Sequence, residues 1–437
     1  MTTIAVVGGG FGGMAAAARL AKLGHEVTLL ERLPALGGAL TPVVDGDFTW
    51  DATATSTLMP AVVRDLFRKS GRPAEREIDL VPLEVIRDHV FEDATTLRLP
   101  GESRAAQIAA FDALGPGLGR QWVDHVATFD ADWEVLRRGY FEVPWDRDAL
   151  PRDVADRLGS RETLHRRLKK RFKDDRLRQV AAYPFVIDGH DPRNVPAWAG
   201  LIAYLEQRFG AWTVQGGMGV LAEAMTARLA TRRVTVETGV EVHDLAMSSG
   251  RVVGVSTTAG VVEADAVIFA IDPRNLPALA SYVARTMPAM PPVVCHVGLS
   301  GDLPEHLASM SHETVLHGDP MLVVRRGGRA PEGHEAWTVL GRGSLAEDIL
   351  TALARHGIDL RDHAVTRVDR SPLELVRHWG SSPLGVLWQG RNTVRQRLGP
   401  ATPIPGVFAA GAHATPGGGL PFVGLSAALV AQVIGPA

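Results

Sequence analysis

The chain has 437 residues, of which 46% are hydrophobic and 22% charged, so disorder is excluded as its main state. Its 46 Lys and Arg nearly balance its 49 Asp and Glu, which excludes a general polyanion-binding surface and argues against a nucleic-acid partner. The single cysteine, Cys295, excludes an internal disulfide framework, a cysteine-based zinc cluster and a CxxC redox pair.

The chain begins with the pattern of a strand, a helix and a second strand. We expect these elements at residues 4–7, 14–23 and 27–30. The same segment lacks the basic start and the cleavage pattern of a signal peptide, which favours a cytoplasmic protein. Two further apolar runs follow at 78–81 and 90–91.

The composition changes sharply at 130–178, where 25 of 49 residues are charged. Apolar positions in 154–180 have helical spacing, which predicts exposed amphipathic helices there. The basic cluster Arg166 to Lys173 is flanked by acidic residues, so we interpret it as a solvated helix face rather than a membrane-binding surface. At most, it allows peripheral membrane contact.

Strand patterns return in the second half of the chain and end in an uncharged segment. Strands are expected at 234–236, 240–245, 252–257, 266–271, 292–300, 335–340 and 406–410, and helices at 345–357 and 423–434. The last forty residues, 398–437, contain no Asp, Glu, Lys or Arg. Prolines and a Gly417–Gly419 run interrupt this stretch, which favours a buried strand, a loop and a core helix over a membrane span.

A dinucleotide-binding pattern occupies the first strand–helix turn. Gly8-x-Gly10-x-x-Gly13 follows the first strand, and Glu31 closes the second. Glycines at these positions allow a tight turn and close approach of a pyrophosphate to the helix N-terminus, while the acid accepts hydrogen bonds from a ribose. This unit alone leaves FAD and NAD unresolved.

The next pattern is a glycine pair, Gly37-Gly38, six residues after Glu31. It resembles the second signature of the glutathione-reductase-type FAD proteins, in the flavin amine oxidase branch. Three more stretches, at 45–55, 78–83 and 209–219, resemble the phytoene desaturase family, as does the closing Gly411-Ala412-His413-Ala414-Thr415-Pro416-Gly417-Gly418-Gly419-Leu420-Pro421. The resemblance covers nearly the whole chain in the same order and is weakest across 104–180.

This resemblance implies FAD as cofactor and a set of residues that contact it. Three departures from the family pattern concern the flavin surroundings: Ala39 after the glycine pair, Thr53-Ala54, and His413-Ala414. A helix beginning near Pro421 would point its positive end at the flavin pyrimidine ring. The implied cofactor-binding residues are Gly8, Gly10, Phe11, Gly12, Gly13, Glu31, Arg32, Gly37, Gly38, Val242, Gly411, Ala412, Pro421, Phe422 and Val423.

The implied fold is α/β, a glutathione-reductase-type (Rossmann-like) FAD-binding domain with an inserted α+β substrate domain. We expect the FAD-binding domain to comprise 1–103, 213–290 and 390–437. The substrate domain is then expected at 104–212 and 291–389.

The implied reaction is an FAD-dependent oxidoreduction in which a substrate C–H delivers hydride to flavin N5 and a double bond forms, as in a desaturase. The implied partners are a largely apolar small molecule and oxygen or a quinone as electron acceptor. Three alternatives stay open: an amine or imine-forming oxidase on a small soluble metabolite, a redox-neutral isomerase or a saturase, and a flavin-binding module without turnover.

Three residues are candidates for contact with the reacting groups. His378 and Trp379 lie where the family has residues facing the substrate cavity, and His413 lies in the closing glycine loop. A structural role explains His413 equally well, and it is the favoured explanation for His378. The other histidines show no ligand spacing, so no metal site is expected.

Overall fold

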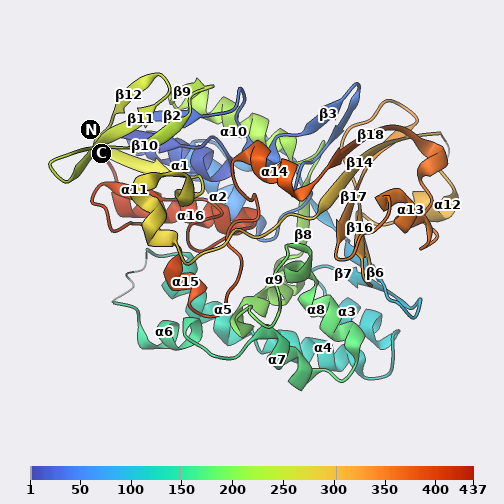
Figure 1. Ribbon diagram of the computed structural model, residues 1–437. Coiled ribbons are helices and arrows are strands. Elements are labelled where there is room, and N and C mark those ends of the chain that lie inside the picture. Colours follow the sequence, from blue (N-terminus) through green and yellow to red (C-terminus); the bar gives the residue numbers. More distant parts are fainter. Residues whose placement is uncertain (1, 145, 147–148, 302) are drawn as a thin grey trace.

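The computed structural model describes residues 2–144, 146, 149–301 and 303–437. Figure 1 shows three regions: a first sheet with its helices, a second sheet beside it, and a layer of helices below both. The α/β fold expected from the sequence is confirmed.

The first sheet is parallel and has the strand order β19-β13-β1-β2-β9. Its central strand β1 is buried on both faces, as an apolar strand in a parallel sheet must be. The first helix, α1, packs on it through the fully buried residues Ala15 to Ala18, whose small side chains allow close approach. The strands are β1 (Thr3–Val7), β2 (Glu26–Glu31), β9 (Thr235–Thr238), β13 (Ala266–Phe269) and β19 (Val407–Ala409).

Helices and a small antiparallel sheet complete this region (Figure 1). The helices in contact with α1 come from distant parts of the chain. The helices are α1 (Phe11–Lys22), α2 (Pro60–Ser70), α10 (Gly219–Thr231) and α16 (Leu420–Ile434). The antiparallel strands are β10 (Val242–Ser248), β11 (Arg251–Thr257) and β12 (Gly260–Glu263).

The second sheet has seven strands in the order β18-β14-β17-β16-β15-β6-β7. All its pairs are antiparallel except β15 with β6. The strands are β6 (Val85–Val90), β7 (Thr96–Pro100), β14 (Val293–Ser300), β15 (Glu313–Leu316), β16 (Met321–Arg326), β17 (His334–Arg342) and β18 (Ala364–Arg370). Since β6 and β7 precede residue 103, the segment 1–103 supplies strands to both sheets, and the proposed domain boundaries stay a prediction.

The helical layer carries the charged window at 130–178. Helix α7 buries Leu164 and Leu168 and exposes Lys169 to Arg171, so the expected amphipathic pattern is present. An aromatic core that includes Phe111, Trp122 and Phe129 joins the helices. They are α3 (Arg104–Asp112), α4 (Leu118–Ala127), α5 (Asp130–Leu136), α6 (Arg152–Leu158), α7 (Leu164–Arg171), α8 (Asp175–Ile187) and α9 (Ile202–Phe209), with the turns η3 (Arg137–Phe141) and η4 (Ala197–Leu201).

Short elements connect these regions. Two small antiparallel pairs are the hairpin of β3 (Val43–Asp45) with β4 (Phe48–Trp50), and the long-range pair of β5 (Leu80–Leu83) with β8 (Ala211–Val214). The short helices are α11 (Pro277–Ala280), α12 (Glu305–Ala308), α13 (Ile349–Ala354), α14 (Pro372–Trp379) and α15 (Thr393–Gln396). The remaining turns are η1 (Gly38–Leu40), η2 (Ala74–Arg76), η5 (Pro273–Asn275), η6 (Ser281–Val283) and η7 (Arg361–His363).

Element ends differ from the sequence expectations in two informative places. The helix expected at 14–23 begins at Phe11, because Gly12 and Gly13 are already part of its first turn, whereas Gly10 before it is extended. The helix expected at 345–357 is limited to Ile349–Ala354, where Asp348 caps its N-terminus through hydrogen bonds from two backbone N–H groups. Within the described ranges, none of the helices combines the length and apolarity that crossing a bilayer requires.

Candidate active site

One cavity of about 810 Å³ runs from the turn after β1 to the second sheet. At one end it is lined by Gly8, Gly10 and Glu31, and at the other by residues of β14 to β17 and of the helical layer. The glycine loop before α16 and the first turn of α16 lie between them. The fold therefore joins the dinucleotide-type turn and a chamber between the second sheet and the helical layer in one continuous space.

The glycines of the first turn serve different purposes. A Cβ at Gly13 would overlap the Gly8 carbonyl oxygen, and one at Gly12 would come 2.9 Å from the Gly411 Cα. A Cβ at Gly10 would meet nothing closer than the Gly38 Cα at 3.9 Å, in a part of the turn that lines the cavity. Packing therefore requires Gly12 and Gly13, whereas Gly10 borders open space of the kind that a ligand phosphate needs.

The second glycine pair lies directly against this turn. The Gly37 N–H donates to the Gly9 carbonyl at 2.9 Å, and Gly37 and Gly38 have φ of 121° and 55°. At the end of β2, the Glu31 carboxylate accepts hydrogen bonds from the N–H groups of Gly9 (2.6 Å) and Leu33 (2.7 Å). These bonds fix the carboxylate at the cavity edge, where it can also accept from a ribose hydroxyl.

The C-terminal segment returns to the same turn. Gly411 lies beside Ala270 at the end of β13, and the first residues of α16, Leu420 to Val423, line the cavity. Helix α16 has Pro421 in its first turn and no acidic residue there. Its unpaired N–H groups and its partial positive charge are therefore free to act on a negatively charged group in the cavity.

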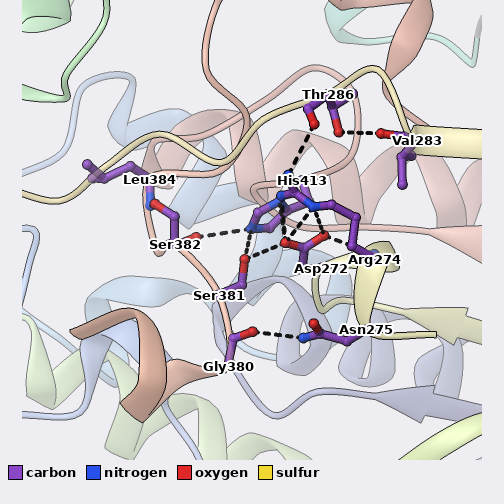
Figure 2. A network of polar contacts seen from close by, with 10 residues as sticks. All are labelled: Asp272, Arg274, Asn275, Val283, Thr286, Gly380, Ser381, Ser382, Leu384 and His413. Atoms are coloured by element: carbon purple, nitrogen blue, oxygen red, sulfur yellow. Dashed lines mark hydrogen bonds and ion pairs between the residues drawn. The ribbon is translucent and has the colours of Figure 1, made fainter. Parts of the chain in front are cut away.

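His413 is part of a polar network that ties three segments together (Figure 2). Its Nε2 lies 3.0 Å from the Ser382 carbonyl and 3.1 Å from the Ser381 hydroxyl, and its Nδ1 lies 3.8 Å from Asp272. Arg274 donates to both oxygens of Asp272, and Ser381 donates to one of them at 2.6 Å. The loop after α14, the end of β13 and the glycine loop are thereby held together.

The network also sets the charge states of its members. Burial alone would raise the pKa of Asp272, but hydrogen bonds from Arg274 and Ser381 hold it below its usual value. Burial lowers the pKa of His413 despite the nearby Asp272. His413 is thus neutral near pH 7 and anchored by protein groups.

The two candidates at the end of α14, His378 and Trp379, differ in whether they line the cavity. Trp379 lines the cavity, together with Leu375 one turn earlier. The ring of His378 is exposed and lies outside the lining, although its carbonyl accepts a hydrogen bond from Arg32. Trp379 therefore remains the candidate of the pair for contact with a substrate.

The other expected cofactor residues gather at one end of the cavity. Gly13 is the exception, because it lies behind the turn against Gly8. The lining includes Gly8, Gly10, Phe11, Gly12, Glu31, Arg32, Gly37, Gly38, Val242, Gly411, Ala412, His413, Pro421, Phe422 and Val423.

A charged group that the sequence reasoning missed lines the opposite end. Arg87 of β6 pairs with Glu206 of α9 and with Glu313 of β15 (3.2 Å), and Glu313 pairs with Arg325 of β16 (2.7 Å). We call these four residues the charged wall. The local sequence contains no clear signal for it, because Arg87 is followed by Asp88 and His89 in a strand that does not have an apolar pattern.

The charged wall is electrostatically balanced. Burial alone would raise the pKa of Glu313, but Arg325 and Arg87 hold it at about 2. The same carboxylates raise the pKa of both guanidinium groups above their usual value despite burial. Glu313, Arg87 and Arg325 therefore keep their charges at neutral pH.

A second carboxylate, Asp51, lies between the two ends. It accepts a hydrogen bond from the Met218 N–H at 2.7 Å and so fixes the start of α10. Burial raises its pKa to about 6, against the effect of hydrogen bonds from Met218 and Gly219 and of the Arg325 charge. Its neighbour Thr53 donates to the Ala39 carbonyl at 2.8 Å, which connects this segment to the glycine pair.

Comparison with known proteins gives a consistent result. Residues 11–435 match the family model described as flavin containing amine oxidoreductase. The chain is 28% identical to a hydroxyneurosporene desaturase from Cereibacter sphaeroides and 25% identical to a 4,4'-diapolycopene oxygenase from a Methylomonas species, each over 99% of this chain and 97% of the relative. An all-trans-zeta-carotene desaturase from Myxococcus xanthus is 30% identical over 65% of this chain and 54% of its own.

Solved structures share the fold at lower identity. A variant of putrescine oxidase has a TM-score of 0.71 at 14% identity, covering 99% of this chain and 97% of that one. An oxidoreductase from Methanosarcina mazei has a TM-score of 0.67 at 17% identity, covering 98% and 100%. At such identities the likeness concerns the fold alone.

Proposed function

Because the chain belongs to the flavin-containing amine oxidoreductase family, and is thus an oxidoreductase with FAD as its cofactor, we propose that it is a desaturase of a largely apolar substrate. The observation that carries this proposal is the continuous cavity, which joins the dinucleotide-type turn to a chamber lined by many apolar side chains beside the charged wall. Full-length relatives whose names describe desaturation or oxygenation of carotenoids support the choice of reaction.

The residues at the turn end of the cavity fit FAD. The open space beside Gly10 suits a pyrophosphate, and Glu31 at the end of β2 suits a ribose. In our assignment Gly8, Gly10, Phe11, Gly12, Glu31, Arg32 and Val242 hold the ADP half, with Gly13 packed behind the turn, while Gly37, Gly38, Gly411 and Ala412 line the ribityl and phosphate side. Pro421 to Val423 then begin the helix that faces the pyrimidine ring.

Bound FAD supplies a two-electron acceptor at its flavin ring. The substrate would lose a hydride from one carbon and a proton from its neighbour, leaving a carbon–carbon double bond, and both electrons and both hydrogens would end on the final acceptor. The chain holds the substrate against the acceptor and excludes water, using apolar lining residues such as Trp198, Leu340 and Phe422. The positive end of α16 stabilises the negative charge that reduction creates. Oxygen or a quinone then removes the electrons.

The decisive experiment is anaerobic reduction of the purified holoprotein by candidate substrates, followed by mass spectrometry of the product. Loss of two hydrogens from a carbon skeleton, with bleaching of the oxidised flavin, is the expected result. Conversion of an amine to an imine would overturn the proposal in favour of an amine oxidase. An unchanged mass or a gain of two hydrogens would instead indicate an isomerase or a saturase.

Trp379 provides a first prediction about this site. Because it lines the cavity beside Leu375, Trp379→Ala should leave the substrate loosely held and slow flavin reduction roughly 10- to 100-fold. FAD occupancy and the flavin spectrum should stay unchanged. Stopped-flow absorbance under anaerobic conditions measures the rate. His378→Ala is the matched comparison, since that exposed ring is expected to be dispensable. Release of FAD by Trp379→Ala would contradict the assignment.

The basic face of α7 provides a second prediction. Arg166, Lys170 and Arg171 are exposed, so their combined reversal to Glu should change turnover of a detergent-dispersed substrate by no more than about twofold. Turnover and co-sedimentation with vesicles rich in anionic lipid would be compared for the reversed and unmodified proteins. Loss of both vesicle binding and turnover from vesicles would instead assign this face to membrane docking.

A further inference from the structure

The charged wall is unexpected in a chamber that takes a purely apolar molecule. Arg87 is only 7% exposed and Glu206 only 4%, yet both line the cavity. The Arg87–Glu206 ion pair and the two ion pairs of Glu313 occupy most of the polar side-chain atoms of the charged wall. Besides the buried Tyr183 hydroxyl, two groups on this side of the cavity are not accounted for by these pairs.

The first is the Nη1 nitrogen of Arg87, which has no hydrogen-bond partner among the residues that the structure describes. The second is the carboxylate of Asp188, which follows α8 and lines the same cavity. Among the described residues it is influenced by the charges of Arg325 and Arg342 without a hydrogen bond to either. Arg342 instead donates to the carbonyl oxygens of Ile187 and Met290.

The hydrogen bonds on this side of the cavity favour a ligand group that donates one. The two arginines of the charged wall pair with its two glutamates, and Arg342 donates to carbonyl oxygens, so the Asp188 carboxylate is left without a donor within the described part of the chain. Burial raises the pKa of Asp188 to about 6, against the effect of Arg325 and Arg342. A carboxylate in such surroundings gains more from a donor than it would in water.

The charged wall is also fixed relative to the cofactor end of the cavity. Arg325 Nη1 donates to the Thr53 carbonyl at 2.8 Å, and the Thr53 hydroxyl donates to the Ala39 carbonyl next to the glycine pair. A group bound at this wall would therefore be held at a set distance from the flavin. Such an anchor selects which carbon of a long skeleton reaches the ring.

We propose that the substrate carries a hydrogen-bond-donating polar group, a hydroxyl or an ammonium, which Asp188 accepts beside Arg87 while the apolar skeleton lies along the rest of the cavity. This inference rests on the proposed function for the position of the flavin, but not on the reaction type. A plain hydrocarbon in the same chamber would leave the Asp188 carboxylate desolvated and unpaired, which is costly, and a hydroxyl, unlike an ammonium, could also accept from Arg87 Nη1.

The test measures binding of matched probes to the oxidised holoprotein through the change in flavin fluorescence. The probes are geranylgeraniol, geranylgeranylamine and the hydrocarbon of the same skeleton. We expect the alcohol or the amine to bind at least about tenfold more tightly than the hydrocarbon, as for a hydrogen bond to a charged group. Equal dissociation constants for all three would overturn the inference.

Two substitutions test whether Asp188 causes the tighter binding of the polar probes. Asp188→Leu should abolish it for both polar probes, whereas Asp188→Asn, which keeps an acceptor oxygen, should weaken the amine and spare the alcohol. Asp175→Leu is the control, because Asp175 is an exposed residue at the start of the same helix. The flavin spectrum reports whether each variant is folded. A preference that survives Asp188→Leu would contradict the assignment.

This experiment distinguishes a failure of the proposed function from a failure of the inference about the polar group, because binding is measured without turnover. If polar probes bind preferentially but no double bond forms, the proposed reaction is wrong and the recognition group stands. If the hydrocarbon is desaturated as readily as the polar probes are, the recognition group is wrong and the reaction stands.

Discussion

Gly10→Val is expected to yield a folded protein that has lost its FAD. A Cβ at this position meets only open space in the chain itself, so the substitution is tolerated by the fold. The added methyl groups would occupy the part of the cavity that we assign to the pyrophosphate. Overpacking of this kind costs about 1–3 kcal/mol, which corresponds to a loss of roughly 10- to 100-fold in affinity.

The ratio of flavin to protein absorbance in purified protein measures occupancy, and far-ultraviolet circular dichroism measures the fold. Gly13→Ala is the contrasting variant, because its Cβ would overlap the Gly8 carbonyl oxygen and disturb the turn with or without cofactor. Thermal unfolding of Gly10→Val should resemble that of apoprotein, since a bound ligand stabilises only the folded state. Full flavin occupancy in Gly10→Val would show that the phosphates lie elsewhere.

The glycine turn could be recognised from the sequence because its geometry is local. Gly8, Gly10 and Gly13 fall within one strand–helix junction, and the steric reasons for glycine act over a few residues. The return of Gly411 to the same place, 2.9 Å from a Cβ at Gly12, is a long-range contact. Only the family resemblance of the closing loop indicated it in advance.

Two elements that we did not expect, β16 and α14, have recognisable patterns in the local sequence. The fully apolar start of β16, Met321 to Val324, suits a buried strand and a core helix equally well. Helix α14 was not expected, although Ser371 and Glu374 form a capping box, with Pro372 as its first residue. That pattern is readable in the sequence and would have defined the start of the helix.

The charged wall could not be assembled from the sequence at all. Its members are single residues on β6, α9, β15 and β16, separated by about a hundred residues or more except for the last two. No spacing rule links them, because their pairing depends on the order of strands in the second sheet. Asp188 could not be recognised from the sequence for the same reason, because its proposed role depends on its lining the cavity on the side of the charged wall.

Glu313→Gln is expected to lower the free energy of unfolding by roughly 3–5 kcal/mol, the usual effect of leaving a buried charge unpaired. Glu313 contacts both Arg87 and Arg325, and its side chain is only 12% exposed. Glu134→Gln is the matched control, because Glu134 also contacts two arginines, Arg137 and Arg138, but is 47% exposed. For Glu134→Gln the free energy of unfolding should fall by no more than about 1 kcal/mol. Urea denaturation of the holoproteins at pH 7 measures both.

The difference in free energy of unfolding between wild type and Glu313→Gln should depend on pH if it is electrostatic in origin. Because the pKa of Glu313 in the folded protein is about 2, below the ordinary glutamate value of 4.5, the folded state binds this proton less readily than the unfolded state does. The stabilisation is therefore complete above the ordinary value and is lost as the pH falls towards 2. The gap between wild type and Glu313→Gln should narrow over that range. A gap independent of pH would mean that packing, rather than the ion pairs of the charged wall, is what the glutamate contributes.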